Sequence, residues 1–142
     1  MPKKLRILIV DDETERRATL ARYIGSSATV VECESAGGAI GLLRRDCGAV
    51  YCGIMLDYDL GGRKGASGGP FLSGEDVADA LCQYIDRSVR VFIHSNAKSH
   101  TPALANRLRQ AGFEVERVSF DDTTESIVRE WVDEIVEALD GD

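Results

Sequence analysis

Two short apolar runs in this chain end abruptly in carboxylates. Asp11 and Asp12 follow the first run, and Asp57 follows the second, with Asp59 just beyond it. Aliphatic runs of this kind are typical of buried parallel strands, whose carboxyl ends lie at the sheet edge where ligands bind. No obvious basic partner lies on the same strands, so the acids would repel one another without a bound cation. Hard oxygen ligands suit Mg²⁺, and the pattern predicts a magnesium site.

Asp57 stands alone at its strand end and is the best candidate nucleophile of the set. A carboxylate is a competent nucleophile toward phosphorus, and aspartyl phosphates are known intermediates. A metal ion held by Asp11 and Asp12 would neutralise the incoming phosphoryl oxygens and allow two anions to approach. Solvated carboxylates in two loops are the plainer alternative. Because both clusters directly follow hydrophobic strands, the pattern favours phosphoryl chemistry.

Another polar group, His94-Ser95-Asn96, follows the apolar run that begins at Val89. The hydroxyl of Ser95 could hydrogen-bond a phosphoryl oxygen at the same sheet edge. His94 alternates to the other face of the strand from Ser95, which favours a packed core histidine. Its position at the strand end leaves general acid–base work or phosphate contact as the alternative.

Strand-like and helix-like segments alternate along the chain. The predicted strands are Leu5–Val10, Thr29–Cys33, Val50–Leu56, Val89–His94 and Glu114–Val118. Helices are predicted from Thr14 to Ile24, after Ser35 as N-cap, from near Ser73, after Thr101 as cap, and over the apolar stripe from Ile127 to Leu139. This alternation predicts an α/β fold: a doubly wound, five-stranded parallel sheet in a three-layer sandwich, with strand order 2-1-3-4-5. In that order the first and third strands are neighbours, and their terminal acids converge.

Composition sets the broad class of protein. The chain has 142 residues, of which 44% are hydrophobic and 29% charged, as expected for one globular domain spanning 1–142. A net charge of −7 disfavours non-specific nucleic-acid binding. We find no apolar stretch of membrane-spanning length and no signal peptide, and we expect a cytoplasmic protein with no membrane contact and reduced cysteines.

The segment 61–74 interrupts the alternation as a glycine-rich loop insertion directly after the strand that carries Asp57. Its glycines and its proline exclude regular structure. A solvated connector is one interpretation. The other is a mobile lid over the acidic pocket, with Arg63 and Lys64 able to reach a phosphate.

Taken together, Ile-Leu-Ile-Val-Asp-Asp-Glu at the first strand, a lone Asp57, Ser95 and a long last helix resemble the receiver domain of bacterial response regulators. The resemblance, a flavodoxin-like fold, covers nearly the whole chain. It implies that Asp11 and Asp12 hold Mg²⁺, that Asp57 accepts phosphate from a histidine kinase or phosphotransfer protein, and that Ser95 senses it. The backbone carbonyl of Asp59 would complete the metal shell.

Three departures separate this chain from that family pattern. The lysine expected at the end of the fifth strand, followed by proline, is missing, and Arg117 near that position keeps only the charge. The loop after Asp57 is longer than usual and lacks the Pro-Gly step. Leu-Asp-Tyr-Asp-Leu-Gly-Gly and Ile-His-Ser-Asn also resemble a receiver variant proposed to recognise or process cyclic-phosphate ends of nucleotides or RNA, although Tyr58 replaces that variant's histidine.

Three functions follow as hypotheses. The first is a stand-alone receiver in a phosphorelay that changes its affinity for a downstream protein partner, with no DNA-binding domain attached. The second is a metal-dependent binder or phosphoesterase of cyclic phosphates that uses Asp11, Asp57, Asp59 and His94. The third is a degenerate receiver that acts only as an interaction module. Enzymatic activity is left open, between a domain that at most phosphorylates and dephosphorylates itself and a phosphoesterase.

Overall fold

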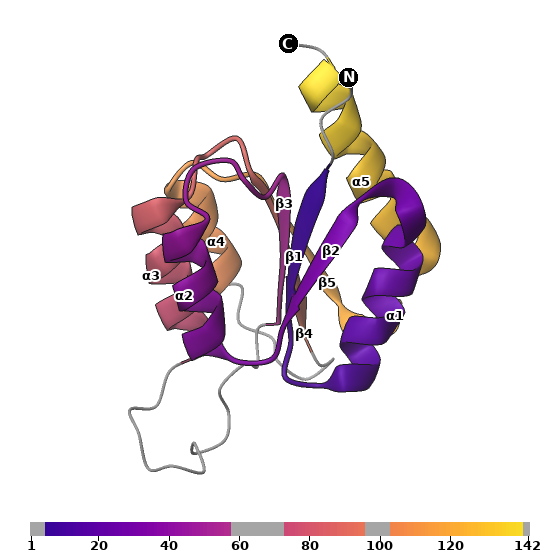
Figure 1. Ribbon diagram of the computed structural model, residues 1–142, viewed down its shortest axis with the longest axis horizontal. Coiled ribbons are helices and arrows are strands. Elements are labelled where there is room, and N and C mark those ends of the chain that lie inside the picture. The colour runs from indigo at the N-terminus through magenta and orange to yellow at the C-terminus, as the bar shows by residue number, and fades with distance from the viewer. Residues whose placement is uncertain (1–4, 58–72, 96–102, 141–142) are drawn as a thin grey trace.

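The structure is a computed structural model that describes residues 5–57, 73–95 and 103–140. Five strands alternate with five α-helices along these residues (Figure 1). The strands are β1 (Arg6–Val10), β2 (Thr29–Cys33), β3 (Gly53–Asp57), β4 (Arg90–Ser95) and β5 (Val115–Ser119). The helices are α1 (Thr14–Ile24), α2 (Ala36–Arg45), α3 (Gly74–Tyr84), α4 (Ala103–Gln110) and α5 (Glu125–Asp140), with short 3₁₀ turns η1 (Gly25–Ser27) and η2 (Phe120–Asp122).

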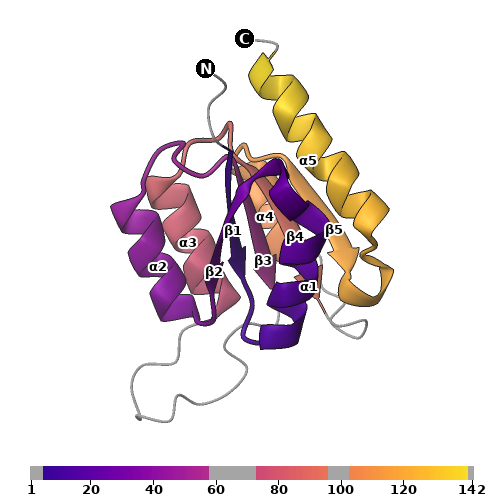
Figure 2. The same cartoon turned by 45° about the vertical axis from the view of Figure 1, so that its right-hand side comes forward.

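The strands form one parallel sheet in the order β2-β1-β3-β4-β5. Helices α1 and α5 cover one face, and α2, α3 and α4 cover the other (Figures 1 and 2). The predicted three-layer α/β fold and its strand order are therefore confirmed. Among the helices of the described residues, none combines the length and apolarity needed to cross a membrane.

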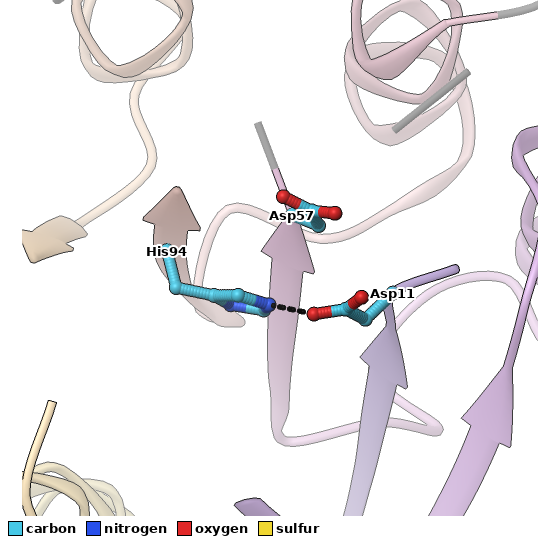
Figure 3. Close-up of side chains that lie close together, drawn as sticks. All are labelled: Asp11, Asp57 and His94. Carbon is cyan, nitrogen blue, oxygen red and sulfur yellow. Dashed lines mark hydrogen bonds and ion pairs between the residues drawn. The ribbon is translucent and has the colours of Figure 1, made fainter. Parts of the chain in front are cut away.

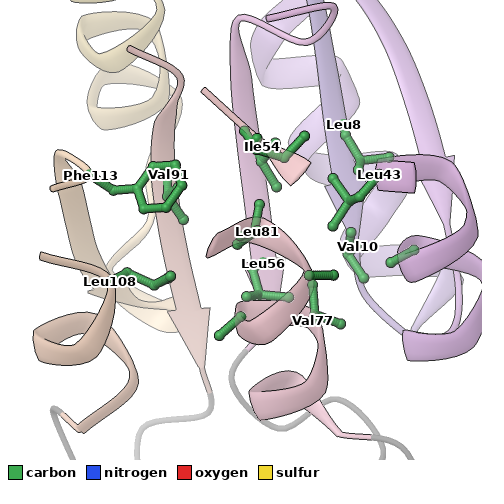
Figure 4. Close-up of a cluster of buried hydrophobic side chains, with 14 of the residues drawn as sticks. Leu8, Val10, Leu43, Ile54, Leu56, Val77, Leu81, Val91, Leu108 and Phe113 are labelled. Carbon is green, nitrogen blue, oxygen red and sulfur yellow. The ribbon is translucent and has the colours of Figure 1, made fainter. Parts of the chain in front are cut away.

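A separate apolar core fills the space on each face of the sheet. Alternate residues of the central strand β3 point to opposite faces, so Ile54 and Leu56 face α2 to α4 while Met55 faces α1 and α5. Figure 4 shows the first of these cores, where Leu81 of α3 and Leu108 of α4 join the strand residues. Burial of both strand faces explains why β3 is a continuous apolar run.

Two strands near the acidic residues differ from the sequence prediction at their ends. β3 begins at Gly53, three residues later than predicted, and includes Asp57, which pairs with His94 of β4. β4 likewise continues through Ser95. Parallel pairing uses backbone groups, so a polar side chain does not end the ladder as the hydrophobic pattern suggested. Asp57 is therefore held by the sheet itself.

Helix caps were partly readable from the sequence. The predicted N-cap Ser35 is confirmed, because its hydroxyl accepts a hydrogen bond from the Gly38 backbone nitrogen at 3.0 Å. Helix α3 begins with a capping box, in which the Ser73 hydroxyl caps the helix and the Asp76 carboxylate accepts from the Ser73 backbone nitrogen at 2.8 Å. The last two residues of the 61–74 segment therefore begin this helix, and residues 61–72 lie outside the described part.

The sheet leaves no room for a side chain at Gly53. A Cβ atom there would lie 2.7 Å from Trp131 and 2.8 Å from Ile135, two buried residues of α5. We expect Gly53→Ala to lower the free energy of unfolding by about 1–3 kcal/mol through overpacking. The matched control, Gly41→Ala on the exposed side of α2, meets no atom within 4 Å. It should raise stability by up to about 1 kcal/mol, because alanine favours a helix. Urea unfolding followed by Trp131 fluorescence measures both, and equal midpoints for Gly53→Ala and wild type would contradict the overpacking.

Candidate functional site

The candidate site lies at the carboxyl edge of the three central strands. Asp11 directly follows β1, Asp57 ends β3, and His94 is the penultimate residue of β4. Strand alternation turns the last two toward the α1 and α5 face. The side chains of all three are fully buried. Figure 3 shows them lying close together across the three strands.

The three side chains offer one ligand atom each within 4.8 Å of one another. A hydrogen bond joins His94 Nε2 to Asp11 Oδ2 at 2.9 Å (Figure 3). The predicted convergence of the acids after the first and third strands is confirmed for Asp11 and Asp57. It follows from the strand order, which makes β1 and β3 neighbours.

Among the described residues, a cation that contacts these acids comes from a helix. The guanidinium of Arg16, in the first turn of α1, lies 3.1 Å from Asp11 Oδ2 through Nε and 3.2 Å from Asp57 Oδ2 through Nη2. It also reaches Glu13 at 3.2 Å and Asp12 at 3.5 Å. Its side chain is only 10% exposed. Arg16 therefore bridges the acid that follows β1 and the acid that ends β3.

Arg16 was not predicted as a site residue, because it lies on a helix and only the strands that carry the acids were considered for basic partners. The signal was present in helical spacing, since Arg16 stands four residues before the buried Leu20 and so lies on the same helix face. That face meets the sheet at the level of the strand ends. An arginine there must find anionic partners, because burial of an unpaired charge is costly.

Asp11 is held by several donors besides Arg16. The backbone nitrogen of Glu13 donates to its Oδ1 at 2.8 Å. The neighbouring Arg17 donates to the Asp11 carbonyl at 2.7 Å and pairs with Glu32 at 3.3 Å. The Asp11 backbone nitrogen donates to the Cys33 carbonyl at 3.0 Å, which continues the pairing of β1 with β2. The position and orientation of this carboxylate are therefore fixed before any ligand binds.

Burial and charge act in opposite directions on the ionisation of Asp11 and Arg16. Burial alone would raise the pKa of Asp11, but the hydrogen bonds from His94 and Glu13, with the positive charge of Arg16, lower it below its usual value. Burial would lower the pKa of Arg16, but Asp11 and Asp57 raise it. Asp11 is therefore an anion and Arg16 a cation throughout the physiological pH range.

His94 is buried, as a core histidine would be, and is also part of the acidic cluster. Because a carboxylate only accepts, Nε2 is the nitrogen that donates to Asp11. The other nitrogen, Nδ1, has no hydrogen-bond partner among the described residues. The ring lies 6.3 Å from that of Phe120, over which Arg16 also packs at 5.7 Å. Asp11 thus fixes the imidazole's orientation beside Asp57.

The remaining predicted site residues are placed differently. Asp12 is 42% exposed at the rim, where it meets Arg16. Arg117 is exposed and precedes Val118, which faces the α5 core, so alternation turns Arg117 to the opposite sheet face from Asp57. The backbone of Ser95 ends β4 beside Ser119. Asp59, Arg63, Lys64 and most of the glycine-rich segment lie outside the described residues.

The donor set fits a divalent cation. Asp11 and Asp57 supply the hard carboxylate oxygens that Mg²⁺ takes, and Asp12 stands at the rim beside them. Both carboxylates are also engaged by the Arg16 guanidinium, through Oδ2 of each. A cation that binds between Asp11 and Asp57 would therefore share these carboxylates with Arg16 or replace it.

Solved structures define the class of fold. The chain resembles the signal receiver domain of a protein described as a Luxo repressor from Vibrio parahaemolyticus, with 24% identity over 95% of this chain and 92% of that one and a TM-score of 0.71. The receiver domain of the response regulator NarL from Mycobacterium tuberculosis gives 23% identity, coverage of 94% and 98%, and a TM-score of 0.64. The BeF3-activated DrrB receiver domain gives 14% identity, coverage of 94% and 98%, and a TM-score of 0.66.

The fold of this chain is therefore that of response-regulator receiver domains, as the sequence resemblance predicted. At these identities the likeness establishes the fold alone. No model of a known protein family matches the sequence. No curated protein matches it either.

Proposed function

We propose that this chain is a receiver-type signalling domain that binds Mg²⁺ and accepts a phosphoryl group on Asp57. The observation that carries the proposal is the carboxylate of Asp57, held at the end of β3 within reach of Asp11, which directly follows the neighbouring strand β1. A receiver fold with acids at this sheet edge has the parts that phosphoryl transfer to a carboxylate needs.

In the proposed reaction an Asp57 carboxylate oxygen attacks the phosphorus of a phosphohistidine or of a small acyl phosphate. The new P–O bond forms as the donor's P–N or P–O bond breaks, and the leaving group keeps the bonding electron pair. Asp11 and Asp57, with Asp12 at the rim, are the residues that would hold Mg²⁺. When bound, the ion supplies positive charge to the transferring phosphoryl oxygens. His94, Glu13 and Arg17 keep Asp11 in place for this task.

The partners in this proposal are a histidine kinase or phosphotransfer protein as donor and a protein that responds to the modified domain. The proposed acceptor supports the first partner, because the carboxylate of an aspartate can attack the phosphorus of a phosphorylated histidine. The net charge of −7 makes nucleic acid a poor candidate for the second. Affinity capture with the phosphorylated domain as bait would identify this responding protein.

The test is incubation with acetyl phosphate, with and without Mg²⁺. We expect the intact mass to rise by one phosphoryl group when Mg²⁺ is present and to stay unmodified when EDTA removes it, because the ion offsets the repulsion between anions. Hydroxylamine should remove the added group, as it cleaves acyl phosphates. A modification that is equally fast in EDTA would contradict the role given to the metal.

A second candidate function rests on His94. Its buried imidazole is oriented by Asp11 and lies beside Asp57, and a histidine paired with carboxylates is a common general acid–base group in phosphoester chemistry. This favours the alternative in which the domain binds or hydrolyses cyclic-phosphate ends. Turnover of a 2′,3′-cyclic nucleotide that His94→Gln abolishes, in a protein that acetyl phosphate leaves unmodified, would favour this function over the first. If neither reaction occurs, a role as an interaction module is the one left.

A further inference from the structure

Arg16 lies in the candidate site but has no role in the proposed phosphoryl transfer. Its guanidinium is nearly buried, and it contacts the carboxylate that ends β3 and the three carboxylates between β1 and α1. An arginine that only offset charge in one ion pair would not need this position. Its Nη2 atom lies 3.2 Å from Asp57 Oδ2, on a carboxylate that would carry the phosphoryl group.

A phosphoryl group on Asp57 would change the balance of charge around Arg16. The modified side chain carries up to about two negative charges on oxygens that lie farther from the backbone than the carboxylate did. Asp11 would at the same time give its oxygens to the divalent cation. The guanidinium would therefore lose a partner on Asp11 and gain one on the phosphoryl group, beside the atom that it already contacts.

Guanidinium geometry suits this exchange. Arginine presents several N–H donors in a planar fork that matches phosphate oxygens, and such charge-assisted hydrogen bonds are the strong ones. The Arg16 stem is fixed in the first turn of α1, and its guanidinium packs over the Phe120 ring at 5.7 Å. A rotation of the last side-chain bonds moves the donors from one anion to the next without moving the helix.

The arginine on β5 does not compete for this role. Arg117 is exposed, and strand alternation turns it to the opposite face of the sheet from Asp57. Arg17 is next to Arg16 in sequence, but it is engaged with the Asp11 carbonyl and with Glu32. Arg16 is thus the described cation whose donors reach the proposed acceptor.

We propose that Arg16 is a phosphoryl-binding residue: it bridges Asp11 and Asp57 in the unmodified domain and transfers its donors to the phosphoryl oxygens once Asp57 is modified. This inference rests on the proposed function. It adds that metal and Arg16 compete for the acids, whereas phosphoryl group and Arg16 attract each other. Removal of Arg16 should therefore move the affinities for metal and for a phosphoryl mimic in opposite directions.

The experiment measures the two affinities separately on the full chain. Calorimetric titration gives the Mg²⁺ affinity in fluoride-free buffer, and ¹⁹F NMR gives the occupancy by BeF₃⁻ at saturating Mg²⁺. The variants are Arg16→Met, which keeps the apolar stem, Arg16→Lys, and the control Arg22→Met, which removes an exposed arginine from the same helix. Circular dichroism establishes that each variant is folded.

We expect Arg16→Met to bind Mg²⁺ more tightly than wild type and to bind BeF₃⁻ about 10- to 100-fold more weakly, as the loss of a charged hydrogen bond implies. An Mg²⁺ affinity that Arg16→Met leaves unchanged or weakens contradicts the competition between Arg16 and metal. Arg16→Lys should lie between wild type and Arg16→Met for BeF₃⁻, and Arg22→Met should match wild type. BeF₃⁻ affinity that Arg16→Met leaves unchanged or strengthens overturns the inference.

Two further outcomes are informative. If Arg16→Met does not fold, Arg16→Lys decides the question, because an unchanged BeF₃⁻ affinity in that folded variant also overturns the inference. If wild type itself binds no BeF₃⁻ at saturating Mg²⁺, the proposed phosphoacceptor function fails first. The wild-type measurement therefore separates failure of the function from failure of the role assigned to Arg16.

Discussion

Asp57→Asn is expected to abolish modification of this chain by acetyl phosphate. The substitution keeps the size and hydrogen-bonding shape of the side chain, but an amide lacks the anionic oxygen that attacks phosphorus. Asp57 is fully buried and lies at the end of the fully buried strand β3, so a neighbouring acid cannot easily take its position. We expect no phosphoryl adduct in the intact mass under conditions that modify the wild-type chain.

The matched control for this experiment is Asp133→Asn. It makes the same chemical change on the exposed side of α5, away from the acids of the sheet edge. This variant should be modified at the wild-type rate. An Asp57→Asn protein that still gains a hydroxylamine-sensitive phosphoryl group would show that another carboxylate is the acceptor, and peptide mapping should then look first at Asp12 on the exposed rim.

The sequence was enough to predict the layers of the fold and the meeting of the acids. Buried parallel strands such as β3 are continuous apolar runs, and the acids after Val10 and Leu56 marked where two of them end. Only a few topologies are compatible with right-handed crossovers. The predicted strand order makes β1 and β3 neighbours, and for this reason Asp11 and Asp57 could be placed together from the sequence.

What the sequence could not supply was the direction of individual side chains. Arg16 enters the site because α1 packs with one face on the sheet, and that rotation depends on the fit of Leu20 and Ile24 in the core. Arg117 was expected near the site because it lies close to the position of the missing lysine at the end of the fifth strand. A shift of one residue along a strand reverses the face, and Arg117 falls on the wrong side of β5 for contact with Asp57.

His94 illustrates how two competing interpretations can both describe one residue. Alternation within β4 correctly predicted a buried side chain, as for Phe92 two residues earlier. The same alternation faces it toward Asp11, since both lie on the α1 and α5 side of the sheet. A polar residue near the end of a buried strand can thus belong both to the core and to the site, because the apolar core on this face borders the acids at the carboxyl edge of the sheet.

Arg16→Met should cost the cation-free domain about 3–5 kcal/mol of stability. Asp11 and Asp57 are fully buried, and removal of one partner from a buried ion pair leaves carboxylates uncompensated. The methionine keeps the apolar stem of the arginine side chain, so the loss of stability reports charge more than packing.

Saturating Mg²⁺ should restore much of that stability, because an ion bound only by the folded state stabilises it by mass action. Urea unfolding with EDTA and with Mg²⁺ measures both effects. Arg22→Met, on the exposed side of the same helix, should change stability by no more than about 0.5 kcal/mol in either buffer. Equal stability of Arg16→Met and wild type in EDTA would mean that the acids tolerate one another without a cation. In that case the competition between Arg16 and metal would have no energetic basis.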